Sequence, residues 1–418
     1  MSAQIKVFSE IKEHAPLSAR PVWQSAQTTD ARPVLILTIA NGAGHTRAAQ
    51  AVAEAIKRNE PASQTIIVDV ADYMNASARF THITAYLWLV KHAPAVWERI
   101  DRYQKRQPHT SPEWYYRRGC RRLFNHARTL QLRALIATEV GCCEIAALIK
   151  RDLELCVPLV AVNINYDADR AWIQPEVDLY TVMTGEYGAT LARQGAPTAR
   201  IAVWGAPLTA GFNDLCSTSN DRAAVCSWLE LDEHRPIILL AGGSEGLGQL
   251  EATFSRLLRD ADHKPQLILL CGRNEKLKRR CERLVRQACD EQRKRVRVLG
   301  WIEDFPMPGL MRAADLFISK LGNAFDEAIA SELPLLALEP PPGSERAQYE
   351  LLDKWGTGRA VRTLDELLAT VKQLLADEQE CARMRANARA RKHTDAASRL
   401  ACWLADEKNA TDQLKEKQ

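Results

Sequence analysis

The sequence predicts an α/β protein with two doubly wound domains, each a parallel sheet covered by helices on both faces. Two observations support this prediction: short apolar runs alternate with segments of helical periodicity, and most runs end in a loop that contains glycine or proline. Strands buried on both faces are typical of parallel sheets, because helices cover both sides. Since 418 residues exceed one ordinary core, we expect two lobes with a cleft between them.

The first series of strands forms an expected N-terminal domain over residues 32–210. Residues 1–31 precede it and have the composition of a polar leader. The apolar runs predict strands at 34–40, 65–70, 134–137, 159–164, 179–183 and 201–204.

The second series forms an expected C-terminal domain over residues 211–404, after a polar interval. Its strands are predicted in PIILLAGGSEG, QLILLCGRN, VRVLGWIEDF, DLFISKLGN and PLLALEPPPG. From about residue 363 the pattern is helical, and 405–418 is expected to be a polar tail.

Composition narrows the class of protein. Hydrophobic residues make up 46% and charged residues 26%, which is typical of a globular protein, and the net charge is only +4. The 11 cysteines are scattered without metal-ligand spacing, so we expect free thiols. No signal-like segment and no apolar run long enough to cross a bilayer is evident, so we expect a cytoplasmic protein that is at most peripheral on the membrane.

A glycine loop, NGAGH, follows the first predicted strand. Gly42 and Gly44 permit backbone angles closed to other residues and let a ligand approach the main chain. A helix is expected to begin at His45 or Thr46, at the carboxyl end of the strand, where open α/β sheets bind their ligands. We therefore expect His45 to point into the site, although one such loop is weak evidence because it matches neither dinucleotide nor P-loop fingerprints.

The second domain repeats this design. Gly243, Ser244 and Gly246 follow a predicted strand and precede a helix, and Gly322 and Asn323 follow another strand in the same manner. A helix N-terminus offers N–H donors and partial positive charge to a diphosphate. Two facing lobes with such loops suit a nucleotide-diphosphate ligand.

Three longer segments resemble a known family. They are NGAGHTRAAQAVAEAI, WIQPEVDLYTVMTGEYGATLARQGAP and GWIEDFPMPGLMRAADLFISKLGNAFDEAIASELPLLALEPPPGSERAQYELL. Over roughly residues 33–362 the chain resembles GT-B glycosyltransferases of the monogalactosyldiacylglycerol synthase and processive diacylglycerol glucosyltransferase type. The resemblance implies a GT-B fold, in which two Rossmann-like domains face a central cleft.

The resemblance also implies that the second lobe binds a UDP-sugar. By this resemblance, the turn at Gly300–Trp301 binds the base, Gly322–Asn323 lies along the phosphates, and Glu327 binds the ribose hydroxyls. Glu345 and Gln348 correspond to residues near the donor sugar. Ser344 and Gln348 depart from the Gln and Asn of the family, so the identity of the sugar stays open.

A further departure lies on the acceptor side, in VNINYDADRAW. Asn165 stands where the family has Asp, and Asp169 stands where it has His, while Trp172 is kept. These departures leave two alternatives, a different acceptor or a lost activity. Asp167 and Asp169 also form a DxD metal signature, but the α/β context does not suit that role, so we expect no metal and no other cofactor.

A basic aromatic stretch between residues 86 and 133 suggests a membrane contact. Interleaved aromatic rings and cations are typical of a segment that lies on an anionic lipid surface. The alternatives are a solvated helical face with its rings packed inward, or, less favoured, nucleic-acid binding, for which no RNA-binding motif is present. The residues predicted to contact the membrane are Trp97, Arg102, Arg106, Trp114, Arg117, Arg118 and Arg121.

Together these features predict an inverting hexosyltransferase that moves a sugar from a UDP-sugar to a lipid hydroxyl, most plausibly that of diacylglycerol. A neutral imidazole can accept the proton of the attacking hydroxyl, and this role is assigned to His45. The alternatives are a transferase with another acceptor, a sugar-nucleotide epimerase, and a non-catalytic nucleotide-sugar-binding protein.

Overall fold

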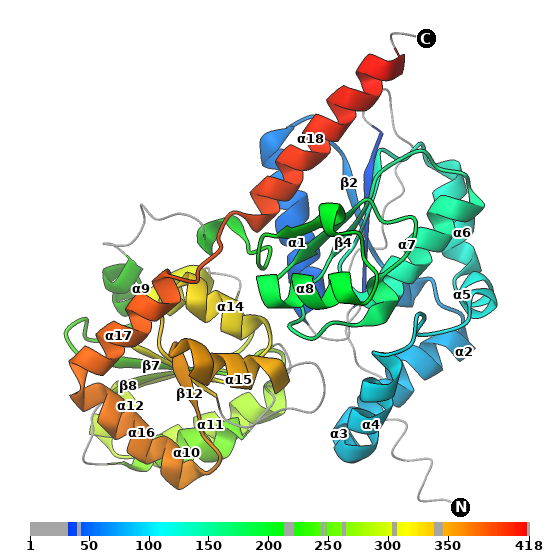
Figure 1. The fold of residues 1–418 in the computed structure, drawn as a ribbon. Helices are drawn as coiled ribbons and strands as arrows, with labels where there is room; N and C mark the ends of the chain where they lie inside the picture. Colours follow the sequence, from blue (N-terminus) through cyan, green and yellow to red (C-terminus); the bar gives the residue numbers. More distant parts are fainter. Residues whose placement is uncertain are drawn as a thin grey trace, which may run out of the picture.

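Two six-stranded parallel sheets form the two lobes of the protein (Figure 1). The computed structural model describes residues 32–39, 43–212, 221–243, 246, 249–260, 265–302, 307–337 and 346–415. The strand orders are β2-β1-β3-β4-β5-β6 and β12-β11-β10-β7-β8-β9. This architecture confirms the predicted fold class.

The N-terminal sheet is built on β1, whose five residues are all buried. Val34 pairs in register with Thr65 of β2 on one side and with Ala134 of β3 on the other. Since both neighbours of β1 run parallel to it, the carboxyl ends of these strands meet at one edge, where ligands bind in such sheets. The strands are β1 (Val34–Thr38), β2 (Thr65–Asp69), β3 (Ala134–Ala137), β4 (Leu159–Val162), β5 (Leu179–Val182) and β6 (Ile201–Val203).

Helices cover both faces of this sheet. They are α1 (Ala43–Asn59), α2 (Ala76–Arg79), α3 (Ala85–His92), α4 (Pro94–Gln104), α5 (Glu113–Gly119), α6 (Arg121–Thr129), α7 (Val140–Asp152) and α8 (Gly185–Arg193). Short helical turns lie at η1 (Val70–Asp72), η2 (Phe80–Thr84), η3 (Arg170–Trp172), η4 (Thr198–Arg200) and η5 (Ala210–Phe212). Helix α1 begins two residues before the expected position, which places His45 inside its first turn.

The C-terminal sheet contains one strand that the sequence did not predict. Strand β12 pairs with β11, with Gly358 opposite Leu335. The strands are β7 (Ile237–Ala241), β8 (Gln266–Leu270), β9 (Val296–Leu299), β10 (Leu316–Ser319), β11 (Leu335–Ala337) and β12 (Gly358–Ala360). The helices are α9 (Asp221–Leu229), α10 (Leu250–Arg259), α11 (Glu275–Gln287), α12 (Asp290–Lys294), α13 (Met307–Ala313), α14 (Asn323–Ala330), α15 (Arg346–Trp355), α16 (Leu364–Ala376) and α17 (Glu378–Arg389).

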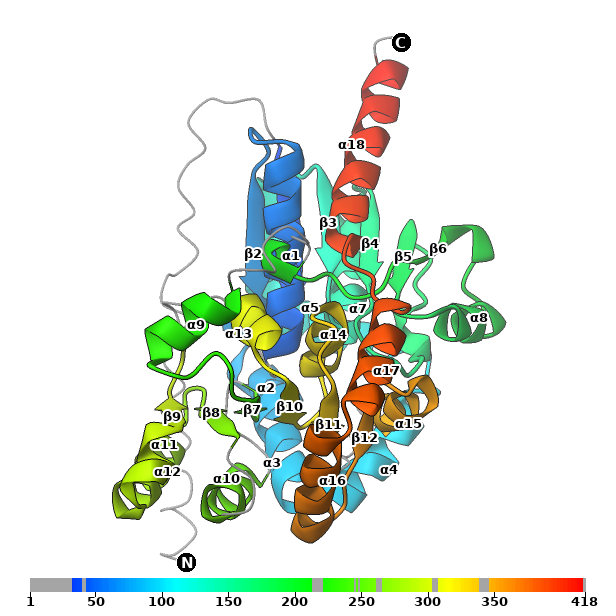
Figure 2. The same ribbon diagram turned by 90° about the vertical axis from the view of Figure 1, so that its left-hand side faces the viewer.

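The last helix, α18 (Ala396–Lys415), returns to the N-terminal lobe and lies along α1 (Figures 1 and 2). Leu400 and Leu404 are buried in one core cluster with Val52 and Ile56 of α1. The structure therefore differs from the expected domain 211–404 and polar tail 405–418, because α18 packs with the first lobe and stays helical to Lys415. The expected leader, 1–31, lies outside the described residues.

Candidate active site

His45 lies in the first turn of α1, half-buried, at the carboxyl edge of the N-terminal sheet. Its Nδ1 is 2.6 Å from the carbonyl oxygen of Thr138, the residue after β3. Because a carbonyl only accepts, Nδ1 must carry the hydrogen and Nε2 of the neutral ring must carry the lone pair. No hydrogen bond to Nε2 occurs among the described residues. The backbone thus fixes the tautomer that a general base at Nε2 requires.

The opposite lobe presents the N-terminus of α14. Gly322 caps this helix with φ of 124°, a backbone conformation that favours glycine. Gln348 on α15 holds this turn, because its Oε1 accepts from Gly322 N at 2.8 Å and its Nε2 donates to Gly322 O at 3.3 Å. Gln348 is buried. Its side chain therefore orients the predicted phosphate loop.

The two lobes meet where α1 and α14 begin. Asn323 Nδ2 donates to the carbonyl oxygen of Gly44 at 3.2 Å. A Cβ at Gly44 would lie 2.6 Å from Asn323 Oδ1, so a larger residue at this position would displace the Asn323 side chain. One turn further along each helix, Arg47 Nη1 lies 2.7 Å from Glu327 Oε1. The imidazole of the first lobe and the predicted phosphate loop of the second lobe therefore belong to helices that touch.

Two adjacent carboxylates of α14 make contacts to the first lobe. Burial raises the pKa of Glu327, and the guanidinium of Arg47 counteracts that rise. Asp326 Oδ1 accepts from Tyr166 OH at 2.6 Å, and burial raises the pKa of Asp326 to about 7. Glu327 was predicted from the sequence, but Arg47, Tyr166 and Asp326 were not, because these contacts join distant parts of the chain.

A cavity of about 250 Å³ lies behind α14, between the two segments that cross from lobe to lobe. Tyr166 and Asp326 line it together with Trp355, which stacks on Phe325 at 5.6 Å between ring centroids. Residues 205, 206 and 208 of the first crossing and 390, 391 and 393 of the second also line it. This cavity lies where the chain crosses between the lobes, and His45 is not among its lining residues.

The remaining donor-side residues lie at the carboxyl ends of β7 and β9. Gly243 and Gly246 have φ of 72° and 57°, and a Cβ at Gly246 would lie 2.7 Å from the carbonyl oxygen of Cys271. Trp301, after Gly300, is exposed, and the Arg273 guanidinium lies 4.5 Å from its ring centroid. The predicted site residues Gly42, Ser244 and Glu345 lie outside the described residues.

The acceptor-side residues follow β4. Asn165 N donates to Asn163 Oδ1 at 2.9 Å, and Asp169 Oδ1 accepts from Ala171 N at 2.9 Å, which caps η3. Burial raises the pKa of Asp169 to about 6. Asp167, the other half of the DxD signature, lies 3.2 Å from Lys105 Nζ. Both carboxylates thus have local structural partners.

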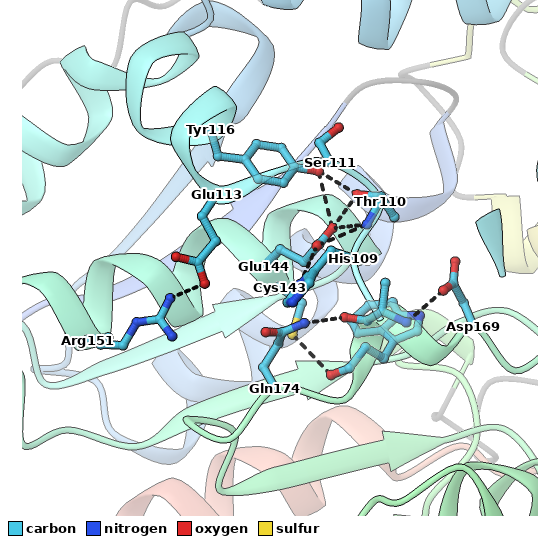
Figure 3. Close-up of polar contacts among 12 residues, drawn as sticks. His109, Thr110, Ser111, Glu113, Tyr116, Cys143, Glu144, Arg151, Asp169 and Gln174 are labelled. Atoms are coloured by element: carbon cyan, nitrogen blue, oxygen red, sulfur yellow. Dashed lines mark hydrogen bonds and ion pairs between the residues drawn. The ribbon is translucent and has the colours of Figure 1, made fainter. Parts of the chain in front are cut away.

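Behind the acceptor side, Glu144 of α7 anchors the connection between α4 and α5 (Figure 3). Its carboxylate accepts from Thr110 N at 3.0 Å, from the Thr110 hydroxyl, and from Tyr116 OH at 3.2 Å. His109 Nδ1 lies 3.3 Å away. Burial raises the pKa of Glu144 to about 8, although the Thr110 hydrogen bonds oppose the rise. This cluster fastens α5 and the connection before it to α7.

Helices α3 and α4 project from the N-terminal lobe (Figure 1), and exposed apolar side chains gather on this region. They are Phe80, Trp88, Val96, Tyr103 and Trp114. Of the described helices, none is both long and apolar enough to cross a bilayer.

The predicted membrane residues divide into two groups. Arg106, Arg118, Arg121 and Trp114 are exposed, as expected of a surface contact. Arg102 is also exposed and pairs with Glu98 of its own helix at 2.9 Å. The other two are engaged within the lobe: Trp97 packs edge-on against Tyr86 with 4.8 Å between centroids, and Arg117 pairs with Asp152 at 2.7 Å and Glu113 at 3.0 Å.

The amino-acid sequence is similar to a known family and to named enzymes. The family model described as Monogalactosyldiacylglycerol (MGDG) synthase matches residues 45–208. A processive diacylglycerol β-glucosyltransferase of Bacillus mycoides is 25% identical over 361 residues, which cover 84% of this chain and 88% of that enzyme. The enzyme of the same name from Staphylococcus carnosus is 24% identical over 245 residues, and the match spans 57% of this chain and 59% of that enzyme.

Solved structures show the same fold at low sequence identity. Acinetobacter baumannii MurG has a TM-score of 0.57 at 15% identity, covering 90% of this chain and 99% of that one. Anabaena Alr3699/HepE, solved in complex with UDP-glucose, has a TM-score of 0.53 at 14% identity, covering 91% of this chain and 100% of that one. A putative UDP-N-acetylglucosamine 2-epimerase from Listeria monocytogenes has a TM-score of 0.57 at 16% identity, covering 92% of this chain and 97% of that one.

The fold of the protein is of the GT-B type, with two Rossmann-like lobes, and its sequence is similar to those of diacylglycerol glucosyltransferases. More particularly, the protein is related to the monogalactosyldiacylglycerol synthases and the processive diacylglycerol glucosyltransferases, as its motifs predicted.

Proposed function

We propose that the protein transfers a hexose from a UDP-sugar to the hydroxyl group of diacylglycerol, with inversion at the anomeric carbon. The observation that supports this most directly is the hydrogen bond from His45 to Thr138 O, which leaves Nε2 as the basic atom, on a helix whose first turn contacts α14. The names of the relatives, which are diacylglycerol glucosyltransferases, support the choice of acceptor.

In this mechanism Nε2 of His45 accepts the proton of the acceptor hydroxyl as its oxygen attacks the anomeric carbon. The bond from that carbon to the diphosphate oxygen breaks, and UDP leaves with the bonding electrons. The imidazolium that forms is stabilised by Nδ1–H donating to Thr138 O. Because the nucleophile attacks opposite the leaving group in one displacement, the configuration inverts.

The second lobe would stabilise the leaving group. Main-chain N–H groups at the start of α14, held by Gln348, face developing negative charge without reorganising during the reaction. Glu327 would accept hydrogen bonds from the ribose hydroxyls, and Gly300–Trp301 would lie against the base. This arrangement assigns no step to a metal ion.

The proposed reaction predicts UDP release that depends on diacylglycerol. The experiment incubates the purified chain with UDP-glucose or UDP-galactose and vesicles with or without diacylglycerol, and measures UDP and labelled glycolipid. We expect equal amounts of UDP and glycolipid, with one sugar preferred. Tight UDP binding with no transfer from either donor would contradict the proposal and favour a binding protein.

We further propose that the protein acts as a peripheral protein on the cytoplasmic face of an anionic membrane, through the exposed apolar side chains on η2 and α3–α5. Trp88 and Trp114 expose indole rings in this region, and Arg106, Arg118 and Arg121 are exposed cations from the same part of the chain. Indole rings enter the headgroup layer while guanidinium groups attract anionic lipids.

Replacing both Trp88 and Trp114 by serine is expected to lower the fraction that floats with anionic vesicles by about tenfold, because two buried indole contacts are lost. The matched control is Trp228→Ser, which removes an exposed indole of α9 in the other lobe and should leave flotation unchanged. Replacing Arg106, Arg118 and Arg121 by glutamine should remove the salt dependence of flotation. Equal flotation of all variants would contradict the proposal that these side chains bind the membrane.

A further inference from the structure

The ion pair between Arg47 and Glu327 joins residues 280 positions apart and crosses between the lobes. The two side chains have unequal environments, since that of Arg47 is 37% exposed and that of Glu327 only 6%. Burying a carboxylate is unfavourable unless a cation or several donors compensate it. Arg47 is therefore the group that permits a charged Glu327 at this place.

The contact uses one edge of the carboxylate. Arg47 Nη1 binds Oε1 at 2.7 Å, and within the described ranges no hydrogen bond to Oε2 occurs. An ionised carboxylate has about four acceptor positions on its two oxygens. A guanidinium on one oxygen thus orients the group and leaves the other oxygen to accept from a ligand.

Few other charges act on this carboxylate. Burial raises the pKa of Glu327, and Arg47 is the charge that lowers it. The neighbouring Asp326 on α14 has its pKa raised by burial and, in part, by the charge of Glu327. It therefore does not stabilise the charge of Glu327. On α1, His45 stands two residues before Arg47. Loss of the guanidinium would therefore leave a buried carboxyl group that favours its protonated form.

We infer that Arg47 is a positioning residue for the donor, which holds Glu327 as an oriented carboxylate so that its second oxygen can accept the ribose hydroxyls. This inference rests on the proposed function, because it takes the nucleoside diphosphate as the ligand. It also gives a physical reason why the lobes must meet for tight binding, since the residue that prepares the ribose contact comes from the acceptor lobe.

The test measures the dissociation constant of UDP by calorimetry on the full chain at pH 6.5, 7.5 and 8.5. Arg47→Met should weaken binding about tenfold at pH 6.5, the scale of one hydrogen bond to a charged group. A folded-state carboxyl whose pKa is raised is protonated at low pH and ionised at high pH. The deficit relative to wild type should therefore shrink as the pH rises. Because UDP itself titrates, the quantity compared is the ratio of the dissociation constants of the variant and the wild type at each pH.

Three further variants separate positioning from a merely structural role. Arg47→Lys keeps a cation, so the ratio of its dissociation constant to that of the wild type should not change between pH 6.5 and 8.5. Glu327→Gln should bind weakly at every pH, and adding Arg47→Met to it should change nothing further. The matched control is Lys354→Met, which removes another ion pair between the lobes, at 2.8 Å to Glu186, and should bind as wild type does.

The outcomes distinguish this inference from the function on which it rests. If the wild type binds UDP and Glu327→Gln weakens binding, but Arg47→Met binds normally or loses affinity equally at all pH values, the inference alone is overturned. If the wild type fails to bind UDP, or Glu327→Gln binds as well as the wild type, the ribose contact is wrong and the inference fails with it.

Discussion

Replacing His45 by alanine is expected to lower turnover by about 100-fold or more, the scale of losing a general base. UDP affinity should change little, because His45 bonds to Thr138 of its own lobe and makes no hydrogen bond with the donor-side residues that the structure describes. Initial rates of glycolipid formation and calorimetric UDP binding, measured on the same preparation, check the two parts separately.

The control for this variant is His234→Ala, which removes an imidazole on the surface of the other lobe, beyond α9. It should retain both turnover and UDP affinity. Normal turnover of the His45→Ala protein would show that His45 is not the general base. A loss of UDP affinity as large as the loss in rate would instead indicate that His45 serves donor binding.

Replacing Gly358 by alanine is expected to destabilise the folded protein by about 3 kcal/mol, the upper range for inserting an atom into packed structure. A Cβ at this position would overlap the carbonyl oxygen of Leu335 and lie 2.6 Å from Leu352 Cδ1. Since Leu335 belongs to β11 and Leu352 to α15, the change should loosen the helix that carries Gln348. Thermal unfolding and UDP binding, measured together, should both weaken.

Gly185→Ala is the matched control for Gly358→Ala. Gly185 begins α8, and a Cβ there would meet nothing within 4 Å. Its midpoint of thermal unfolding should equal or exceed that of the wild type, because alanine favours helices more than glycine does. A normal midpoint for Gly358→Ala would show that β11 and β12 can separate without cost.

The strands were predictable because most of them are uninterrupted apolar runs. Strand β12 was not, because Gly358–Ala360 contains Arg359 and is held by backbone pairing with β11. The helical nature of α18 up to residue 404 was evident from its sequence, but its continuation to Lys415 and its packing partner were not. Its buried residues Leu400 and Leu404 could have packed on either lobe, and only the folded chain shows that they cover α1.

The candidate site was predictable where its signal is local. The glycine loop before His45 and the glycine turn before Asn323 each indicate a binding site within a few residues of sequence. Arg47 gave no such signal, because its role depends on a carboxylate 280 residues away. Tyr166 and Asp326 are likewise 160 residues apart. Contacts between the lobes depend on the tertiary structure, so local sequence patterns do not predict them.

The path of α18 limits how the lobes can move. The polypeptide passes from one lobe to the other twice, first near residues 204–208 and again near 390–395. Two neighbouring crossing segments should resist twisting of one lobe against the other, while rotation of the lobes about the line that joins the two segments stays possible. The helix that bears the imidazole is also braced by the last helix of the chain. Shortening α18 should therefore loosen α1 and disturb His45, the proposed base.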